Sequence, residues 1–221
     1  MALGAPIGRR EENKRKKREA LQREGLAVIG ELGFEAASIE QIAQRAEVAR
    51  GTFYLYFPDK QSLFQDLMER FFQPIEACFD DTGAALSRCE DRRAVYEAYR
   101  EMTSQLAIIG LGHHEEILVA FREARQPGAA GEWLRERERA LIERAVAFTE
   151  DVTGRGLLSV SNPRVACLVV YGAVERLFYE VLTGHDLGHP ATLAEDVLGL
   201  FGQAMGFNPA ADDPAPGASH G

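Results

Sequence analysis

The chain has 221 residues, of which 46% are hydrophobic and 27% are charged, and its formal net charge is −9. This composition is typical of a globular protein that buries a sizeable core, as one domain or two small ones. No apolar run approaches the roughly 20 residues that cross a bilayer, and residues 1–18 lack the apolar stretch of a signal peptide. We therefore expect a cytoplasmic protein.

The charge is unevenly distributed along the chain. Residues 1–72 carry 12 Lys and Arg against 11 Asp and Glu, a net charge of +1, whereas residues 73–221 carry 13 against 23, a net charge of −10. Seven basic residues fall between Arg9 and Arg18. A basic arm before an acidic body is typical of a protein that meets a polyanion at one end only.

Helical periodicity dominates the sequence, and alternating strand patterns are nearly absent. The first predicted helix carries an apolar face and ends at Gly33, since glycine often follows a helix. The face consists of Leu21, Gly25, Val28, Ile29 and Leu32. Ser38 and Gln41 then form a capping box for a second helix that runs to about Ala46.

A short helix follows at about 50–56 and a longer one at 60–72. Asn162-Pro163 is a start signal for an apolar helix, because proline fits the first helical position. The other predicted helices cover 91–109, 115–125, an apolar stripe from Leu134 to Val152, 165–182 and 192–205. The sequence therefore predicts an all-α fold of three short helices followed by about six longer ones.

Two short helices joined by a tight turn and packed on a third form a helix-turn-helix, here at 38–57. Phe53 and Phe57 are four residues apart and share a buried face, while Arg50 and Tyr54 share another. The second helix can enter a DNA major groove. At its start, Arg50 is the candidate for a bidentate contact with guanine.

The neighbouring residues supply further candidate DNA contacts. Gly51 lets the backbone approach a phosphate, the Thr52 and Tyr54 hydroxyls can bind phosphate oxygens, and Lys60 begins the next helix. Leu55 can touch a thymine methyl. The full predicted set comprises Ser38, Gln41, Ala49, Arg50, Gly51, Thr52, Tyr54, Leu55, Tyr56 and Lys60.

Three stretches of the sequence form one pattern: Gly33-Phe34, Ser38-Ile39-Glu40-Gln41-Ile42-Ala43, and Gly51-Thr52-Phe53-Tyr54-Leu55-Tyr56-Phe57-Pro58-Asp59-Lys60 with Leu63-Phe64 after it. Together they resemble the DNA-binding domain of the tetracycline-repressor (TetR) family. The resemblance covers about residues 15–75. It implies a flexible basic arm at 1–14, a helix-turn-helix domain at 15–75, a helical effector-binding and dimerisation domain at 76–207, and a disordered tail at 208–221.

Three positions depart from that family's pattern. Glu47 replaces the usual turn glycine, and a non-glycine residue at positive φ costs about 1 kcal/mol. Ala49 replaces a capping serine or threonine, which is worth about 1 kcal/mol. Gly25 stands where alanine is common and lowers helix propensity. We expect a DNA-binding head of modest local stability.

The resemblance also implies a homodimer that reads a palindromic operator. The helices at 165–182 and 192–205 would pack with their mates as a four-helix bundle. The first is apolar nearly all round, which is unusual for a helix with one exposed side. The alternative is a helix buried within one protomer.

The family further implies a small-molecule effector bound among the middle helices, which releases a repressor from DNA. A mostly apolar lining indicates a hydrophobic or amphipathic effector, such as a drug-like aromatic or a fatty acyl compound. The candidate lining residues are Phe72, Met102, Gln105, Ile109, His113, Phe121, Phe148, Thr149, Tyr171, Glu175 and Phe178.

Other classes of protein find little support in the sequence. No HExxH, GxSxG, glycine-rich phosphate loop or ExxH pairing is present, so we expect no enzyme, cofactor or metal. The three cysteines, Cys78, Cys89 and Cys167, are widely spaced and are expected to be reduced and buried. A loop pair of His185 and His189 is the alternative metal site, and a ligand-independent helix-turn-helix adaptor is the alternative function.

Overall fold

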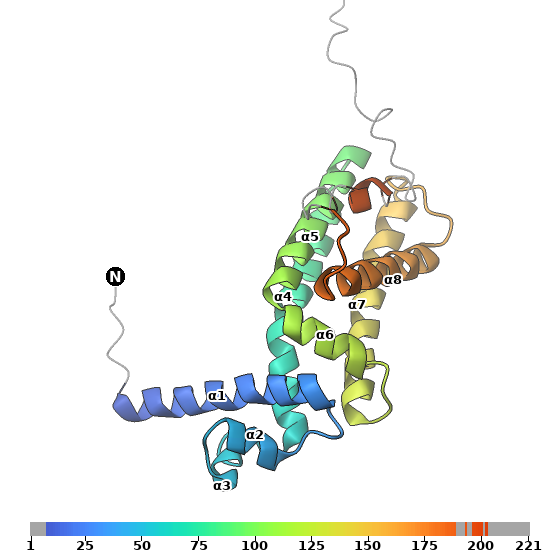
Figure 1. Cartoon of the computed structure of the whole chain (residues 1–221). Coiled ribbons are helices and arrows are strands. Elements are labelled where there is room, and N and C mark those ends of the chain that lie inside the picture. Colours follow the sequence, from blue (N-terminus) through green and yellow to red (C-terminus); the bar gives the residue numbers. More distant parts are fainter. Residues whose placement is uncertain (1–7, 189–192, 194–195, 201, 203–221) are drawn as a thin grey trace, which may run out of the picture. The chain divides into compact units, whose positions relative to one another are not determined.

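The computed structural model describes residues 8–188, 193, 196–200 and 202. Within these residues the structure contains helices and no strand, so the predicted all-α fold is confirmed (Figure 1). The helices are α1 (Arg9–Leu32), α2 (Ile39–Arg45), α3 (Arg50–Phe53), α4 (Lys60–Leu86), α5 (Arg92–Gly112), α6 (His114–Glu123), α7 (Ala129–Gly154) and α8 (Pro163–Leu182).

The chain divides into two compact units. The first contains the residues up to Phe72 together with Glu115–Arg135, and the second contains Gln73–His114 and the residues from Glu136 onward. The helix-turn-helix unit thus includes α6 and the start of α7, which the sequence analysis assigned to the following domain. Helix α4 belongs to both units, and the predicted helix at 60–72 is too short because α4 continues through Pro74 to Leu86.

The first unit closes around one apolar core, which explains the helical stripe of the sequence. The side chains of Leu21, Ile29, Ile42, Phe53, Leu63, Phe64 and Met68 have no exposed surface. Close packing explains the glycine at position 25, because a Cβ on Gly25 would lie 2.7 Å from Leu63 Cδ2. The expected loss of helix propensity at Gly25 is therefore accompanied by a close approach of α1 to α4.

The start of α2 confirms the predicted capping box. The Gln41 amide N–H donates to Ser38 Oγ over 3.2 Å, and the Ser38 amide N–H donates to Gln41 Oε1 over 2.9 Å. These two bonds satisfy backbone donors that a helix start leaves without intrahelical partners.

The turn between α2 and α3 has both predicted irregularities. Glu47 has φ of 55°, the left-handed region that favours glycine. Ala49 is the N-cap of α3 and makes no side-chain cap hydrogen bond. The turn therefore stores backbone strain beside a short uncapped helix.

The strain at Glu47 predicts a stabilising substitution. Glu47→Gly should raise the free energy of unfolding by about 0.5–1 kcal/mol, because glycine adopts positive φ without a Cβ clash. Urea denaturation of the full chain measures this. Glu47→Ala keeps the strained backbone and serves as the control, and an equal gain from Glu47→Ala would contradict the explanation.

The beginnings of α4, α5 and α8 are also capped. The Asp59, Asp91 and Asn162 side chains accept backbone N–H groups of the first turn that follows each of them. The predicted Asn162-Pro163 start signal is confirmed, since Pro163 is the first residue of α8.

The second unit has an apolar core of its own, built from α4, α5, α7 and the segment after α7. Its buried members are Leu86, Val95, Tyr99, Val152 and Leu158. The Tyr99 hydroxyl lies 3.0 Å from Thr149 Oγ1, so the two buried polar groups satisfy each other.

The predicted helix at 192–205 is described only at residues 193, 196–200 and 202, which are helical. Its other residues and the predicted tail at 208–221 lie outside the described residues, as do residues 1–7 of the predicted arm. The arm is helical from Arg9, the first residue of α1. None of the described helices is long and apolar enough to cross a membrane.

Candidate nucleic-acid interface

Helix α3 and the turn after it have one buried side and one exposed side. The Phe53 and Phe57 side chains are 0% and 3% exposed, and their ring centroids lie 5.8 Å apart. On the other side, Leu55 is 78% and Tyr54 is 45% exposed. Two aromatic anchors thus fix this segment on the core while its outer side chains are free to meet a ligand.

The regular part of α3 is shorter than the predicted range of 50–56. Helix α3 ends at Phe53, and the amides of Leu55 and Tyr56 donate to Thr52 O and Phe53 O, three residues back. This tighter turn leads directly into Pro58, which cannot donate a backbone hydrogen bond. The predicted contact residues Tyr54, Leu55 and Tyr56 therefore lie in a turn rather than in a helix.

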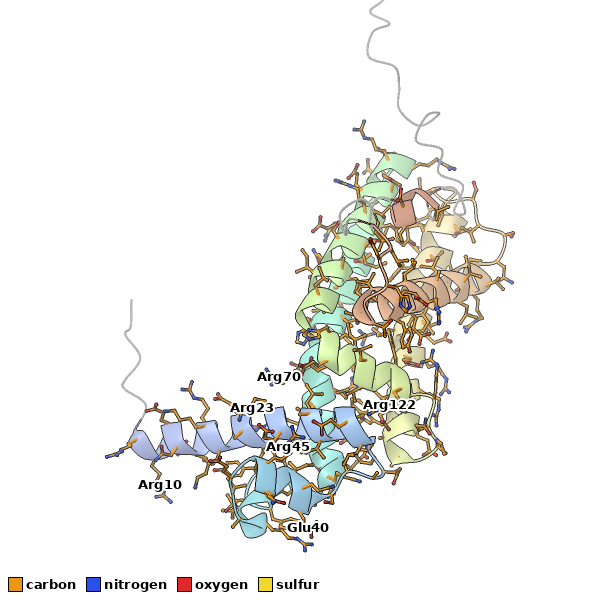
Figure 2. All side chains as sticks on the ribbon, in the orientation of Figure 1. Arg10, Arg23, Glu40, Arg45, Arg70 and Arg122 are labelled. Carbon is orange, nitrogen blue, oxygen red and sulfur yellow. The ribbon has the colours of Figure 1, made fainter. Side chains whose placement is uncertain are left out.

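Arg50 is the exposed cation at the start of α3. Its guanidinium lies 3.5 Å from the Tyr54 hydroxyl and forms an ion pair with Glu40 of α2, and these two partners raise the pKa of Arg50. The Arg50 side chain is 60% exposed. The sequence analysis missed Glu40, because nothing in the spacing predicts that α2 turns this side chain toward α3 (Figure 2).

The other predicted contact residues differ in how free they are. Gly51 is exposed and no atom lies within 4 Å of a Cβ placed there, so a phosphate can approach the backbone. Ala49 is exposed, and Thr52 and Tyr56 are half-buried. Ser38 and Gln41, by contrast, already use polar side-chain atoms in the capping box of α2.

Lys60 bonds within the protein, whereas the sequence predicted a phosphate contact. Its ammonium donates to the carbonyl oxygens of Phe34, Glu35 and Ala37 over 2.5, 3.2 and 2.8 Å. It also stands 4.4 Å from the centre of the Phe34 ring. Partial burial lowers the pKa of Lys60. All three N–H donors therefore tie α4 to the turn before α2, and the phosphate contact stays a prediction.

This geometry predicts a structural effect of replacing Lys60. Lys60→Met should lower the free energy of unfolding by about 2–3 kcal/mol, because hydrogen bonds from a charged donor to three carbonyl groups are lost. Urea denaturation measures the loss. Lys16→Met is the matched control, since Lys16 is exposed and pairs with the exposed Glu12 on its own helix, and should change stability by less than about 0.5 kcal/mol. Unchanged stability with weaker binding to every DNA sequence would instead assign Lys60 to phosphate contact.

A second cation, Arg122 of α6, binds carbonyl oxygens at the C-terminal end of α1. Arg122 of α6 donates through Nη1 to Gly30 O over 2.7 Å and through Nη2 to Ile29 O, and its Nε donates to Glu123 Oε1 over 2.9 Å. Figure 2 shows Arg122 beside the C-terminal end of α1. The carboxylate of Glu123 is buried and neutralised by this pair. The link joins α6 to α1 within the first unit.

The predicted effector-binding residues are divided between the two units, and their role in effector binding stays a prediction. Phe72 and Phe121 belong to the first unit, where the Phe72 ring packs 5.9 Å from Trp133. The others belong to the second unit. They are Met102, Gln105, Ile109, His113, Phe148, Thr149, Tyr171, Glu175 and Phe178.

In the second unit, two of these residues meet a polar group that the sequence analysis missed. The Phe148 ring lies 6.0 Å from Tyr99, whose hydroxyl pairs with Thr149. Cys167 of α8 donates to Thr149 Oγ1 over 3.6 Å. Burial raises the pKa of both Tyr99 and Cys167, so neutral groups line this part of the core.

No group of three His, Cys, Asp or Glu side chains in the described residues is placed to hold a metal ion. Burial raises the thiol pKa of Cys78, Cys89 and Cys167, which disfavours the reactive thiolate. His189 of the alternative pair lies outside the described residues.

The fold and the exposed edge of α3 define a helix-turn-helix protein of the DNA-binding class. Residues 23–67 match the profile of "Bacterial regulatory proteins, tetR family". The repressor KstR of Mycolicibacterium smegmatis is 36% identical over 74 residues, which are 34% of this chain and 36% of KstR. The matched region thus spans about a third of that relative.

Two solved structures share the fold over most of their length. FadR of Bacillus subtilis in complex with stearoyl-CoA is 19% identical with a TM-score of 0.64, over 84% of this chain and 98% of that one. NalD, the secondary repressor of the MexAB-OprM multidrug efflux pump of Pseudomonas aeruginosa, is 21% identical with a TM-score of 0.67, over 88% and 98%. Residues 23–67 therefore match the DNA-binding region of the TetR family, and the fold of the chain is similar to that of these two regulators.

Proposed function

We propose that this protein is a repressor that binds a palindromic DNA operator as a homodimer and leaves it when a hydrophobic or amphipathic small molecule binds the second unit. The observation that carries the DNA-binding part is the two-sided α3 segment. Its buried aromatic anchors hold Arg50, Tyr54 and Leu55 at an exposed edge next to a backbone that is open at Gly51.

Arg50 is the base-reading residue in this proposal. In the free protein its guanidinium pairs with Glu40, and a guanine would take over these hydrogen bonds with its O6 and N7 acceptors. The exposed Leu55 can contact a thymine methyl. The hydroxyls of Thr52, Tyr54 and Tyr56, and the backbone at Ala49 and Gly51, would position the edge on phosphates.

Replacing Arg50 tests this assignment. Arg50→Ala should weaken operator binding by about 1–3 kcal/mol per half-site and relax the preference at one base pair, because a bidentate base contact is lost. Binding to a set of single-base operator variants measures both effects.

Arg45→Ala is the matched control for Arg50→Ala, because it removes the same charge from a cation that pairs with Glu24 and Glu31 of α1. It should leave the base preference intact. Unchanged preference in Arg50→Ala would contradict the base-reading role.

The exposed face of α8 supports the dimer. Val165, Leu168, Val169 and Tyr179 are 52%, 48%, 63% and 43% exposed, although α8 is the helix with the most apolar stretch of sequence. These side chains and Gly172 between them fall on one side of the helix, together with Arg176, whose guanidinium lies over the Tyr179 ring. An apolar stripe of this kind is stabilised when a second copy covers it.

A charge on this stripe should separate the protomers. The double variant Leu168→Glu and Val169→Glu is expected to sediment as a monomer at micromolar concentration, where the wild type sediments as a dimer, because an interface core does not accommodate unpaired carboxylates. Ile108→Glu on α5, where Ile108 is 71% exposed, is the control and should keep the dimer. A wild-type monomer would count against the proposal.

The chemical class of the effector is inferred from the core of the second unit. Apolar side chains surround the neutral hydroxyls of Tyr99 and Thr149, which suits a molecule that is largely apolar with a few polar atoms. The FadR structure contains stearoyl-CoA, and NalD is a repressor of a multidrug efflux pump, so these two regulators favour the same range, from fatty acyl to drug-like compounds. Mass spectrometry of a copurified small molecule distinguishes this proposal from a ligand-independent adaptor.

The route from effector to DNA would run through α6. This helix follows α5 of the second unit directly in the chain, and Arg122 attaches it to the carbonyl groups at the end of α1. An effector that favours a different position of α6 would thereby shift the head. The effector can shift the equilibrium between the DNA-bound and the released conformation only by as much as its affinities for these two conformations differ.

A further inference from the structure

The N-terminal half of α1 is a helix without tertiary packing. Residues 9–19 are exposed apart from Glu12, which is half-buried, and the first buried residue is Leu21. Nine residues before Arg18 extend about 13 Å at 1.5 Å per residue. We call residues 9–17 the overhang of α1. They precede the region 23–67 that matches the TetR-family profile.

Charge is segregated around the overhang. On one side, Lys16 pairs with Glu12 over 2.8 Å and Arg15 pairs with Glu19 over 3.7 Å, so this side is close to neutral. On the other side stand Arg10, Lys14 and Lys17, spaced at i, i+4 and i+7, with no acidic residue among them. Arg10, Lys14 and Lys17 therefore give the overhang one basic face.

This basic face points to the same side as the candidate DNA-binding edge. Continued along the helix, the face of Arg10, Lys14 and Lys17 becomes the buried stripe that includes Leu21 and Val28. Figure 2 shows Arg10 on the side of α1 where α2 and α3 lie, and Arg23 on the opposite side.

The base of the overhang is fixed in direction by α4. Arg18 forms an ion pair with Asp66 of α4 and stands 5.6 Å from the centre of the Phe57 ring. Gln22 donates to the same Asp66 carboxylate over 2.5 Å. These contacts fix the direction in which the overhang leaves the helix-turn-helix core.

We propose that Arg10, Lys14 and Lys17 form a second DNA-binding surface, which grips backbone phosphates outside the half-site that α3 reads. The inference rests on the proposed function, since it needs the head to lie on duplex DNA. The overhang is about as long as the major groove is wide, roughly 12 Å, so it can reach phosphates beyond the groove that α3 enters. Phosphate contacts of this kind add affinity and carry no base preference.

The test compares two double variants of the full chain that remove equal charge. Lys14→Gln with Lys17→Gln removes the basic face, and Arg15→Gln with Lys16→Gln removes cations of the paired face. Glutamine has nearly the helix propensity of lysine and arginine, so α1 should keep its helix. The probes are a 40-base-pair duplex of mixed sequence and one carrying an operator selected with the wild-type chain.

Loss of two phosphate contacts should make the negative slope of log K against log salt less steep, by about 1.8 per half-site. Affinity for both duplexes should fall about 30-fold per half-site at about 0.15 M salt, with base preference unchanged. The paired-face variant should lose less than about threefold. Hydroxyl-radical footprints should show wild-type protection flanking each half-site, absent in the basic-face variant.

Two outcomes overturn the inference at different levels. Equal losses from both double variants, with wild-type binding intact, would show a general charge effect and reject the second surface alone. A wild-type chain that binds neither duplex would reject the proposed function and the second surface with it.

Discussion

The helix-turn-helix unit depends on how the carbonyl groups between Ile29 and Ala37 are satisfied. This segment ends α1 and leads to α2, where a helix end leaves carbonyl oxygens without intrahelical donors, although Ile29 O also accepts from the Gly33 amide. Lys60 of α4 and Arg122 of α6 supply them from positions far along the chain. Because each cation also carries a desolvation cost, the pairing is stable only when α1, α4 and α6 are all in place. The position of α2 and α3 on the core follows from this constraint.

The candidate DNA-binding edge is supported by that frame and has little stability of its own. Helix α3 has four residues, an uncapped N-terminus and a strained residue, Glu47, before it. Isolated helices of this length do not form in water, so burial of Phe53 and Phe57 holds the edge in place. The exposed Arg50 side chain takes no part in the core, which suits the proposed exchange of Glu40 for a base.

Local chemistry made much of the fold predictable from the sequence. The capping box at Ser38, the start of α8 at Asn162 and the buried pair Phe53 and Phe57 each depend on residues at most four positions apart. The role of Lys60, the ion pair of Arg50 with Glu40 and the grip of Arg122 on α1 depend on partners 26, 10 and 92 or 93 positions away. Periodicity and motif spacing carry no information about such contacts, which is why these assignments came only from the structure.

In the proposed function, the first unit of each protomer recognises one half-site of a palindromic DNA sequence. Selection of bound duplexes from a random library with the full wild-type chain tests it most directly. The expected result is enrichment of a palindrome whose half-sites each contain a guanine contacted by Arg50, with affinity that falls steeply as salt rises. Recovery of no enriched sequence, or of an asymmetric single site bound by a monomer, would contradict it.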